Sequence, residues 1–238
     1  YSIMKDINDI CFILSCRVNS TRIIKKMIRP FGETNLFEIA IKKILALNVP
    51  KKNIYIAIGD KELIDIAKKY DVNIFYRSDK SINSSALNIN ECFEWCNEFS
   101  KKFKYFFWMN GCQPFLKVDT INKFINTFIN SNNKSIITVN KIKNYFWDND
   151  KKLNKDNFIH NNMDNFAFNT KYVNPTYAAS HSMQLGLLSE LVNGTWLGTF
   201  EKDDPELFFV EEEESFDIDY PWQFEMAELK YKNIIQNN

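Results

Sequence analysis

Short apolar runs alternate with segments of helical spacing along this chain, and the alternation restricts its possible folds more than any other feature. The apolar runs lie at 12–14, 54–58, 72–76 and 105–108. Apolar residues recur at helical spacing over 36–44, 63–67 and 121–128, and a further helix is expected over about 85–99. Strands that alternate with helices form a mostly parallel sheet with helices on both faces. We therefore expect an α/β fold built around such a sheet.

Polar residues mark where two of these helices begin. Asn35 precedes the helix over 36–44, and Asp60 precedes the helix over 63–67. Asn and Asp side chains accept hydrogen bonds from the free N–H groups of a first helical turn. Both residues are therefore predicted to be N-caps.

Length and composition fit one enzyme-sized domain. A chain of 238 residues is long for one small domain and short for two full ones, so we expect a single domain over 1–238 with an inserted arm. Its 45% hydrophobic content, with 21 Phe, is enough for a sizeable core. The formal net charge of zero argues against a general nucleic-acid binder, so any anion site must be local.

Cysteine content and hydropathy bear on the location of the protein. The five cysteines are an odd number and form no Cys-x-x-Cys pair, so we expect free thiols in a reducing compartment and no zinc site. No apolar run is long enough to cross a bilayer, and no secretory signal is evident at the start. The expectation is a cytoplasmic protein whose partners include neither a membrane nor a nucleic acid.

The first apolar run leads into a loop crowded with cations. These are Arg17, Arg22, Lys25 and Lys26. The hydroxyls of Ser20 and Thr21 lie among them. Loops that follow the strands of open α/β sheets bind ligands, and Arg and Lys beside hydroxyls suit a polyphosphate. On charge alone, a solvated surface loop is the simpler interpretation.

A second turn of interest follows the apolar run at 105–108. Gly111 permits close approach of the backbone to a ligand, and Pro114 fixes the direction in which the chain leaves the turn. A purely structural turn has the same composition, so its position after a strand is the stronger argument for a site.

Two carboxylates near the end of the chain form a third candidate site. On a strand, residues two apart face the same side, so Asp217 and Asp219 are predicted to project together and to hold Mg²⁺. Helix capping is the alternative, because Pro221 suits the first turn of a following helix. Capping explains Asp219 but not Asp217. The glutamates of 211–214, immediately upstream, are interpreted as a solvated edge or hairpin.

Clear periodicity is lost between 140 and about 175. Asn, Asp and Lys are frequent there, but aromatic residues are interspersed among them. The segment is too aromatic for simple disorder. An ordered arm and a surface loop are the two interpretations.

Residues near both ends of the chain resemble one family of enzymes, the cytidylyltransferases that activate ulosonic acids, which include the sialic acid and ketodeoxyoctonate synthetases. The N-terminal resemblance rests on Ser15-Cys16-Arg17, Ser20, Arg22 and Lys26, where Ser15-Cys16 replaces the usual Pro-Ala. At the other end, Asp217-Ile218-Asp219 is similar to the family's metal-binding element. The resemblance covers almost the whole chain. It implies a Rossmann-like, three-layer nucleotidyltransferase fold and an arm over 140–178 that crosses to a second subunit, making a homodimer.

The resemblance also implies a set of site residues. Those expected to bind the nucleotide are Ser15, Cys16, Arg17, Ser20, Thr21, Arg22, Lys26, Arg77, Asn110, Gly111 and Cys112. Arg17 and Lys26 are expected to be catalytic, through the triphosphate. Gln113 and His181 are expected to border the acceptor sugar, and Asp217 and Asp219 to hold Mg²⁺. Cys112 stands where family members often carry an Asp.

The function implied is transfer of CMP from CTP to an acidic sugar, with release of pyrophosphate, for surface glycan biosynthesis. A nine-carbon ulosonic acid is the first choice of acceptor and an eight-carbon one the second. A phosphate or phosphonate acceptor stays open because of the altered position at Cys112. A metal-dependent glycosyltransferase and a catalytically silent nucleotide-binding protein are the rivals from other classes.

Overall fold

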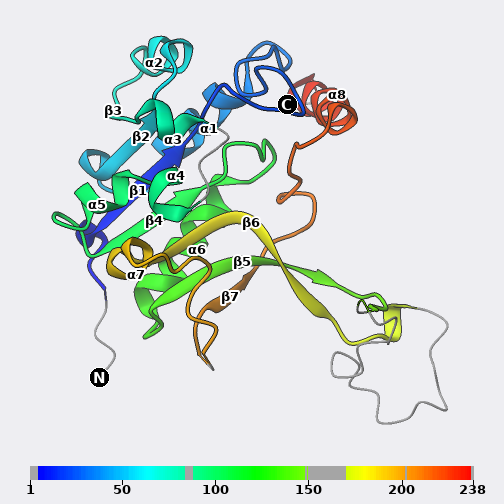
Figure 1. Ribbon diagram of the computed structural model, residues 1–238. Helices are drawn as coiled ribbons and strands as arrows, with labels where there is room; N and C mark the ends of the chain where they lie inside the picture. Colours follow the sequence, from blue (N-terminus) through cyan, green and yellow to red (C-terminus); the bar gives the residue numbers. More distant parts are fainter. Residues whose placement is uncertain (1–4, 84–87, 148, 150–169, 202, 237–238) are drawn as a thin grey trace.

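The computed structural model describes residues 5–83, 88–147, 149, 170–201 and 203–236 (Figure 1). Within these residues, seven strands form one sheet in the order β3-β2-β1-β4-β6-β5-β7. The strands are β1 (Ile10–Ser15), β2 (Ile54–Ile58), β3 (Asn73–Tyr76), β4 (Tyr105–Met109), β5 (Ser135–Ile142), β6 (Thr176–Leu187) and β7 (Glu206–Phe209). Only β6 runs antiparallel to its neighbours, β4 and β5. The prediction of a mostly parallel sheet is confirmed.

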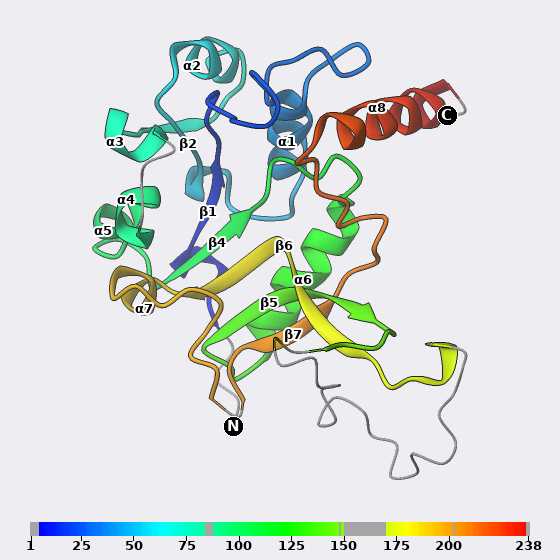
Figure 2. The same cartoon turned by 45° about the vertical axis from the view of Figure 1, so that its right-hand side comes forward.

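Helices cover both faces of the sheet (Figure 2). The α-helices are α1 (Leu36–Leu45), α2 (Lys61–Ala67), α3 (Asp79–Ile82), α4 (Ile89–Cys92), α5 (Trp95–Phe99), α6 (Val118–Asn130), α7 (Leu188–Val192) and α8 (Pro221–Gln236). Short 3-10 turns lie at Ile7–Asp9, Lys51–Asn53 and Thr170–Tyr172. Buried side chains of α1, α2, α6 and α8 share one core cluster, and those of α5 and α7 share the other. No helix among the described residues is long and apolar enough to span a bilayer.

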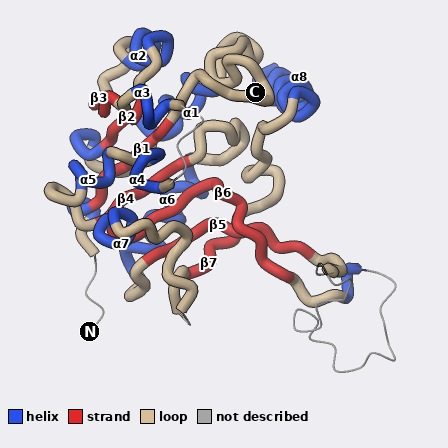
Figure 3. The backbone as a smooth tube through the Cα atoms, viewed as in Figure 1, coloured by secondary structure: helices blue, strands red, loops and turns tan. Residues whose placement is uncertain are grey.

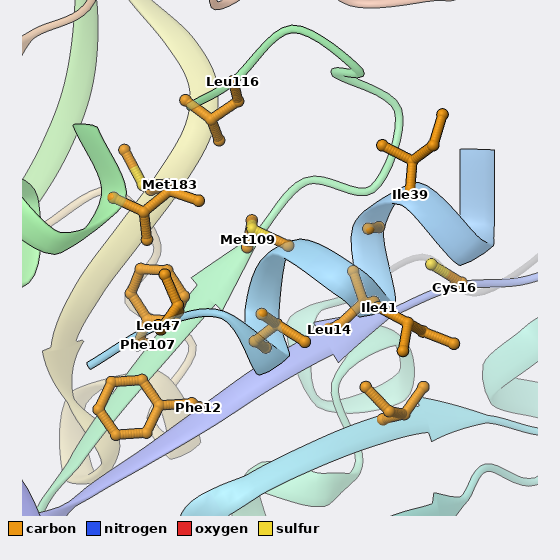
Figure 4. Close-up of a cluster of buried hydrophobic side chains, with 14 of the residues drawn as sticks. Phe12, Leu14, Cys16, Ile39, Ile41, Leu47, Phe107, Met109, Leu116 and Met183 are labelled. Atoms are coloured by element: carbon orange, nitrogen blue, oxygen red, sulfur yellow. The ribbon is translucent and has the colours of Figure 1, made fainter. Parts of the chain in front are cut away.

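The central strands are apolar throughout because both of their faces are buried. Phe12 and Leu14 of β1 lie in the core cluster under α1, whereas Ile13 lies in the cluster on the other face. The ring centroids of Phe12 and of Phe107 in β4 lie 5.7 Å apart. Both rings are labelled in Figure 4. Burying one such side chain stabilises the fold by roughly 1.5–3 kcal/mol. A continuous apolar run is therefore the expected sequence signal of these strands.

The predicted caps had different outcomes. The side chain of Asn35 accepts a hydrogen bond from the N–H of Glu38 at 2.9 Å, so this N-cap prediction is confirmed. Asp60 precedes α2, but its carboxylate makes no capping bond to that helix. Instead, Oδ2 of Asp60 accepts from the N–H of Val18 at 2.8 Å, so the capping role predicted for the side chain is wrong.

The helix predicted over 85–99 is also wrong as a single element. The described part forms two short helices, α4 and α5, because Phe93 has φ −119° and ψ 49° and breaks the helical path. The ring of Phe93 stacks on Trp196 at 4.9 Å and lies 6.1 Å from Trp108. The packing of Phe93 against Trp108 of β4 and against Trp196 thus overrides the local helical pattern.

The paired strands β5 and β6 extend together beyond the rest of the sheet (Figures 1 and 3). Their pairing continues to Ile142 and Thr176, at the base of the arm predicted over 140–178. Most of that predicted arm lies outside the described residues. Nearer the body, the register jumps from Ile137 opposite Gln184 to Val139 opposite Ala179, which makes a bulge in β6.

Candidate active site

A pocket of about 250 Å³ lies where β1 and β4 end. Leu14 of β1 is in register with Met109 of β4, so the loops that follow these two parallel strands meet at the same edge of the sheet. The pocket is lined by Ser15, Cys16, Arg17, Asn19, Ser20, Thr21, Arg22, Lys26, Met27, Asn110, Gly111, Cys112 and Asp219. The loop predicted to be cationic, the turn after β4 and one of the paired carboxylates therefore form one site.

The backbone of the cationic loop is anchored at its start. The N–H of Cys16 donates to the carbonyl of Ala57 at 3.1 Å, and the N–H of Val18 donates to Asp60. The guanidinium of Arg77 donates to the carbonyl of Cys16 at 3.1 Å. These bonds connect the loop to β2 itself, through Ala57, and to the segments that follow β2 and β3, through Asp60 and Arg77. They fix the position of the backbone beside Arg17, which lines the pocket and whose guanidinium donates to the carbonyl of Asn83 at 3.2 Å.

Ion pairs join the cationic loop to the carboxylate segment. Arg22 lies 2.8 Å from Asp219, 197 positions away in the sequence, and Lys26 lies 3.6 Å from the same carboxylate oxygen. Lys26 also donates to the carbonyl of Ile218. Burial lowers the pKa of the Lys26 ammonium, but Cys112 and the nearby carboxylates outweigh burial, so the pKa is raised overall. Lys26 is therefore a fixed positive charge in the pocket at neutral pH.

Asp217 and Asp219 flank a buried Ile218, although the segment that carries them is not a strand. The side chain of Ile218, between them, is fully buried in the core, and its N–H donates to the carbonyl of Cys112 at 3.2 Å. One oxygen of Asp217 accepts a hydrogen bond from the side chain of Asn110 at 3.2 Å. The buried Ile218 thus separates the two carboxylates, and of the two only Asp219 lines the pocket.

Asp217 has an unsatisfied oxygen inside the protein. Its Oδ1 is buried and has no hydrogen-bond partner. Burial raises the pKa of this carboxyl, and the charge of Asp219 raises it further. An ionised carboxylate in this position is costly unless a cation neutralises it. Two carboxylates with a free buried oxygen are a donor set that fits a divalent cation such as Mg²⁺.

The described residues include no group of three or more His, Cys, Asp or Glu side chains that could hold a metal ion. A divalent cation at Asp217 and Asp219 would therefore take its other ligands from water and from the phosphates of a substrate, as Mg²⁺ does in phosphate-handling sites.

Helix capping does not explain the carboxylate of Asp219. Helix α8 begins at Pro221, as predicted, and its N-terminus is closed by Gln223. Oε1 of Gln223 accepts hydrogen bonds from the N–H groups of Asp219 and Tyr220, at 2.7 and 2.8 Å. Gln223 is the back-reaching member of a capping box, which leaves the Asp219 side chain free to pair with Arg22 and Lys26.

The turn after β4 is closely packed against the cationic loop. A Cβ atom on Gly111 would lie 3.0 Å from Sγ of Cys16 and 3.1 Å from Cε of Met27, so only glycine fits without displacement. The close approach predicted for Gly111 is thus made to two sulfur-containing side chains. Sγ of Cys112 lies 3.6 Å from Sδ of Met27, and burial raises the pKa of the Cys112 thiol.

A lysine of α1 holds the same turn from outside the pocket. Nζ of Lys43 donates to the carbonyls of Gln113 and Pro114, at 2.9 and 2.6 Å. Burial lowers the pKa of this ammonium to about 7, and Glu214 acts weakly in the opposite direction. Nothing in the sequence pattern of α1 signals this contact, because it joins positions 70 and 71 residues apart.

Four residues predicted for the site do not line the pocket: Asp217, described above, Arg77, Gln113 and His181. Arg77 is turned toward backbone carbonyls, with bonds to Cys16, Ser81 and Cys92, so it supports the loop from behind. Gln113 is 2% exposed and donates to the carbonyl of Ser180 at 3.1 Å.

His181 lies in the bulge of β6. It is exposed, with φ of 51°, and its charge lowers the pKa of Asp217, so it lies on the carboxylate side of the site. Bulges next to a site commonly redirect one side chain.

Conversely, Asn19 and Met27 line the pocket although neither was predicted. Asn is frequent throughout this chain, and Met resembles any core residue, so neither residue type gave a signal.

Comparison with known proteins finds one family whose model matches most of the chain. A model of the family described as cytidylyltransferase matches residues 11–182. The 3-deoxy-manno-octulosonate cytidylyltransferase of Rickettsia bellii is 24% identical over 135 residues, which is 57% of this chain and 54% of that protein. The spore coat polysaccharide biosynthesis protein SpsF of Bacillus subtilis is 34% identical over 73 residues, 29% of this chain and 30% of that protein. The chain thus spans about half the length, or less, of the curated relatives it matches.

Solved structures agree on the fold. The 4-diphosphocytidyl-2C-methyl-D-erythritol synthase of Anaerococcus prevotii superposes with a TM-score of 0.66 at 19% identity, over 95% of this chain and all of that one. A CMP:2-keto-3-deoxy-manno-octonic acid synthetase, solved with CTP, gives 0.65 at 9% identity, over 94% of this chain and 98% of that one. The Rossmann-like nucleotidyltransferase fold predicted from the sequence is confirmed.

Proposed function

Because this chain belongs to the cytidylyltransferase family, we propose that it transfers CMP from CTP to an acidic sugar and releases pyrophosphate. The acceptor oxygen attacks the α-phosphorus of CTP, and the bond from that phosphorus to the pyrophosphate oxygen breaks. Such a reaction needs positioned reactants and stabilised negative charge more than it needs covalent chemistry from the protein.

The observation that carries the proposal is the pairing of Arg22 and Lys26 with Asp219. It supports a site in which cations for a triphosphate and carboxylates for a metal meet across a single pocket. When CTP enters, the phosphates would replace Asp219 as partners of the two cations. The carboxylate would then be available to a metal on the other side of the phosphates.

We assign the triphosphate to the cationic loop. Arg17, Arg22 and Lys26 would bind its oxygens, with Ser20 and Thr21 donating hydroxyl hydrogen bonds. Lys26 is the least exposed of these cations, with 11% of its side chain accessible, so its attraction for phosphate is screened least by water. Lys26, on this ground, and Arg17, from the resemblance to the family, are the proposed catalytic cations.

Asp217 and Asp219 are the proposed Mg²⁺ ligands. A bound Mg²⁺ supplies positive charge that polarises phosphoryl oxygens and reduces their repulsion of an incoming anionic acceptor. Asn110 orients Asp217 through its side-chain amide and leaves Oδ1 free. The thiol of Cys112, whose pKa is raised, contributes no charge at neutral pH.

An acidic sugar of the ulosonic class is the proposed acceptor. The relative from Rickettsia bellii is named for an octulosonate, which supports an eight-carbon acid of this class. The Anaerococcus synthase is named for a diphosphocytidyl product, so phosphorylated acceptors also belong in the test. His181 lies beside the carboxylate segment and is the proposed contact to the acceptor. Surface glycan biosynthesis and a cytoplasmic location remain predictions from the sequence.

Homodimerisation is proposed through the base of the arm and the edge strand β7. Large apolar side chains are exposed along the extended strands and the edge strand: Trp147, Tyr177, Leu207 and Phe209, each between 45% and 64% exposed. Exposed large apolar side chains are typical of interfaces when they gather on one part of a surface. A second copy of the chain, placed there, would cover it.

The test is pyrophosphate release from CTP and Mg²⁺ across eight- and nine-carbon ulosonic acids, a sugar phosphate and a phosphonate, with ATP, GTP and UTP as controls. We expect release that requires CTP and a ulosonic acid. Lys26→Met should abolish it, whereas Lys25→Met is the matched control, because Lys25 lies outside the pocket lining and pairs with Glu62 at 3.3 Å. Equal rates in the two variants, or hydrolysis of a sugar nucleotide instead, would contradict the proposal.

A further inference from the structure

A second cavity, of about 610 Å³, lies between the 211–216 segment and the first half of α8. It shares no lining residue with the nucleotide pocket. Cavities of this size accommodate small organic molecules. The segment that carries the two carboxylates borders both cavities, because Phe216 lines the second one and Asp219 lines the first.

The walls of this cavity are aromatic and apolar. Phe115 and Phe216 pack with ring centroids 6.4 Å apart, and Trp222 and Met226, one turn apart on α8, complete the walls. Trp222 is 59% exposed and Met226 is 60% exposed. Covering such surface is favourable by about 25 cal/mol for each Å² removed from water, so the walls favour a ligand with an apolar body.

The rim of the cavity carries an excess of negative charge. The lining includes the glutamates of 211–214 but only two cations, Lys117 and Lys230, which leaves two carboxylates in excess. Lys117 pairs with Glu214 at 3.2 Å, and Lys230 pairs with Glu213 at 2.8 Å. The exposed side chains of the other two glutamates, at 211 and 212, make no ion pair within the described residues. The rim therefore favours a cation.

Lys230 shows which kind of cation the cavity accepts. Its ammonium lies 5.1 Å from the centre of the Phe115 ring and 2.8 Å from Oε1 of Glu213. One alkylammonium of the chain itself is therefore bound by an aromatic face and a carboxylate, the arrangement that recognises organic cations. Among the described residues, no cation lies over either of the other two aromatic walls, Phe216 and Trp222.

We propose that this cavity binds an aliphatic amine, and that a diamine fits it best. The methylene chain lies along Trp222 and Met226, and the ammonium groups lie beside the carboxylates of Glu211 and Glu212. A dication matches the excess of two negative charges on the rim. Lys230 competes for the same walls from within the chain.

The test uses protein labelled with [methyl-¹³C]methionine, titrated with 1,5-diaminopentane at constant ionic strength. The Met226 methyl signal, identified by its loss in Met226→Leu, should shift saturably. The Met27 methyl, in the nucleotide pocket, should stay in place. Pentane-1,5-diol, the neutral molecule of the same length, should cause no saturable shift. A diol that binds as well as the diamine would overturn the proposal.

Variants distinguish recognition of the ammonium charge from nonspecific apolar binding. A double change, Glu211→Gln and Glu212→Gln, should weaken diamine binding at least tenfold, whereas Lys230→Met should strengthen it several-fold by removing the internal competitor. Lys232→Met is the matched control, because Lys232 pairs with Glu228 on the same helix and does not line the cavity. Unchanged affinity in the double variant, or equal affinity in Lys230→Met and Lys232→Met, would refute the proposal.

Discussion

Replacing Lys43 by Met tests whether a buried ammonium holds the turn that forms one wall of the nucleotide pocket. In the folded protein, burial lowers the pKa of Lys43 from 10.5 to about 7. The unfolded chain therefore binds this proton more tightly than the folded one, and between about pH 7 and pH 10.5 unfolding takes up a proton. Because stability rises with pH wherever the unfolded state binds more protons, Lys43 should make the protein more stable as the pH increases above 7.

The size of the effect follows from the two pKa values. Over pH 7 to 9, this one group should raise the free energy of unfolding by about 2 kcal/mol. That figure is an upper limit, because part of the Lys43 side chain is exposed and water screens its charge. The thiols titrate in the same region, so the useful quantity is the difference between wild type and Lys43→Met at each pH, in which their contribution cancels.

Urea unfolding followed by circular dichroism at pH 7, 8 and 9 measures that difference. The stability of wild type relative to Lys43→Met should increase with pH, and activity should fall in the variant because the carbonyls of Gln113 and Pro114 lose their donor. Lys42→Met, at an exposed position of the same helix, is the control for the loss of one lysine. A difference that stays constant from pH 7 to 9 would refute the reasoning.

Further substitutions test other parts of the account. Asp217→Asn should abolish Mg²⁺-dependent turnover. At pH values above about 4 it should also raise the melting temperature, because it removes a carboxylate whose pKa burial raises. A lower melting temperature than that of wild type at pH 8 would contradict this. Gly111→Ala should destabilise by about 1–3 kcal/mol, since its Cβ meets Cys16 and Met27, and the added change Cys16→Ala should recover part of the loss in urea unfolding. Asn35→Ala should cost about 0.5–2 kcal/mol through loss of the α1 cap, and a neutral result would show that the cap is dispensable.

The sheet was predictable because its central strands carry the strongest signal that a sequence offers. β2 and β4 are buried on both faces, so nearly every residue in them is apolar, and their predicted positions agree with the structure. The Asn35 cap was predictable for a related reason, since its bond to Glu38 is local. Each of these signals depends only on residues that are close together in the sequence.

The site was predictable only in part, because its contacts join distant residues. The two ends of the site were identified by resemblance to a family, whereas their contact, Arg22 with Asp219, has no sequence signal of its own. Asp60 has the position of a cap, but the competing donor at Val18 lies 42 residues away. The supporting role of Lys43 is hidden in the same way.

Labelled CTP tests the central claim most directly. With a ulosonic acid and Mg²⁺, label in the α-phosphate should appear in a conjugate with the acceptor, and label in the γ-phosphate should appear only in pyrophosphate. Asp219→Asn and Lys26→Met should both lose the conjugate while keeping the fold. Transfer of the γ-label to an acceptor, or an undiminished yield of conjugate from both variants, would contradict the assignment of cytidylyl transfer to this pocket.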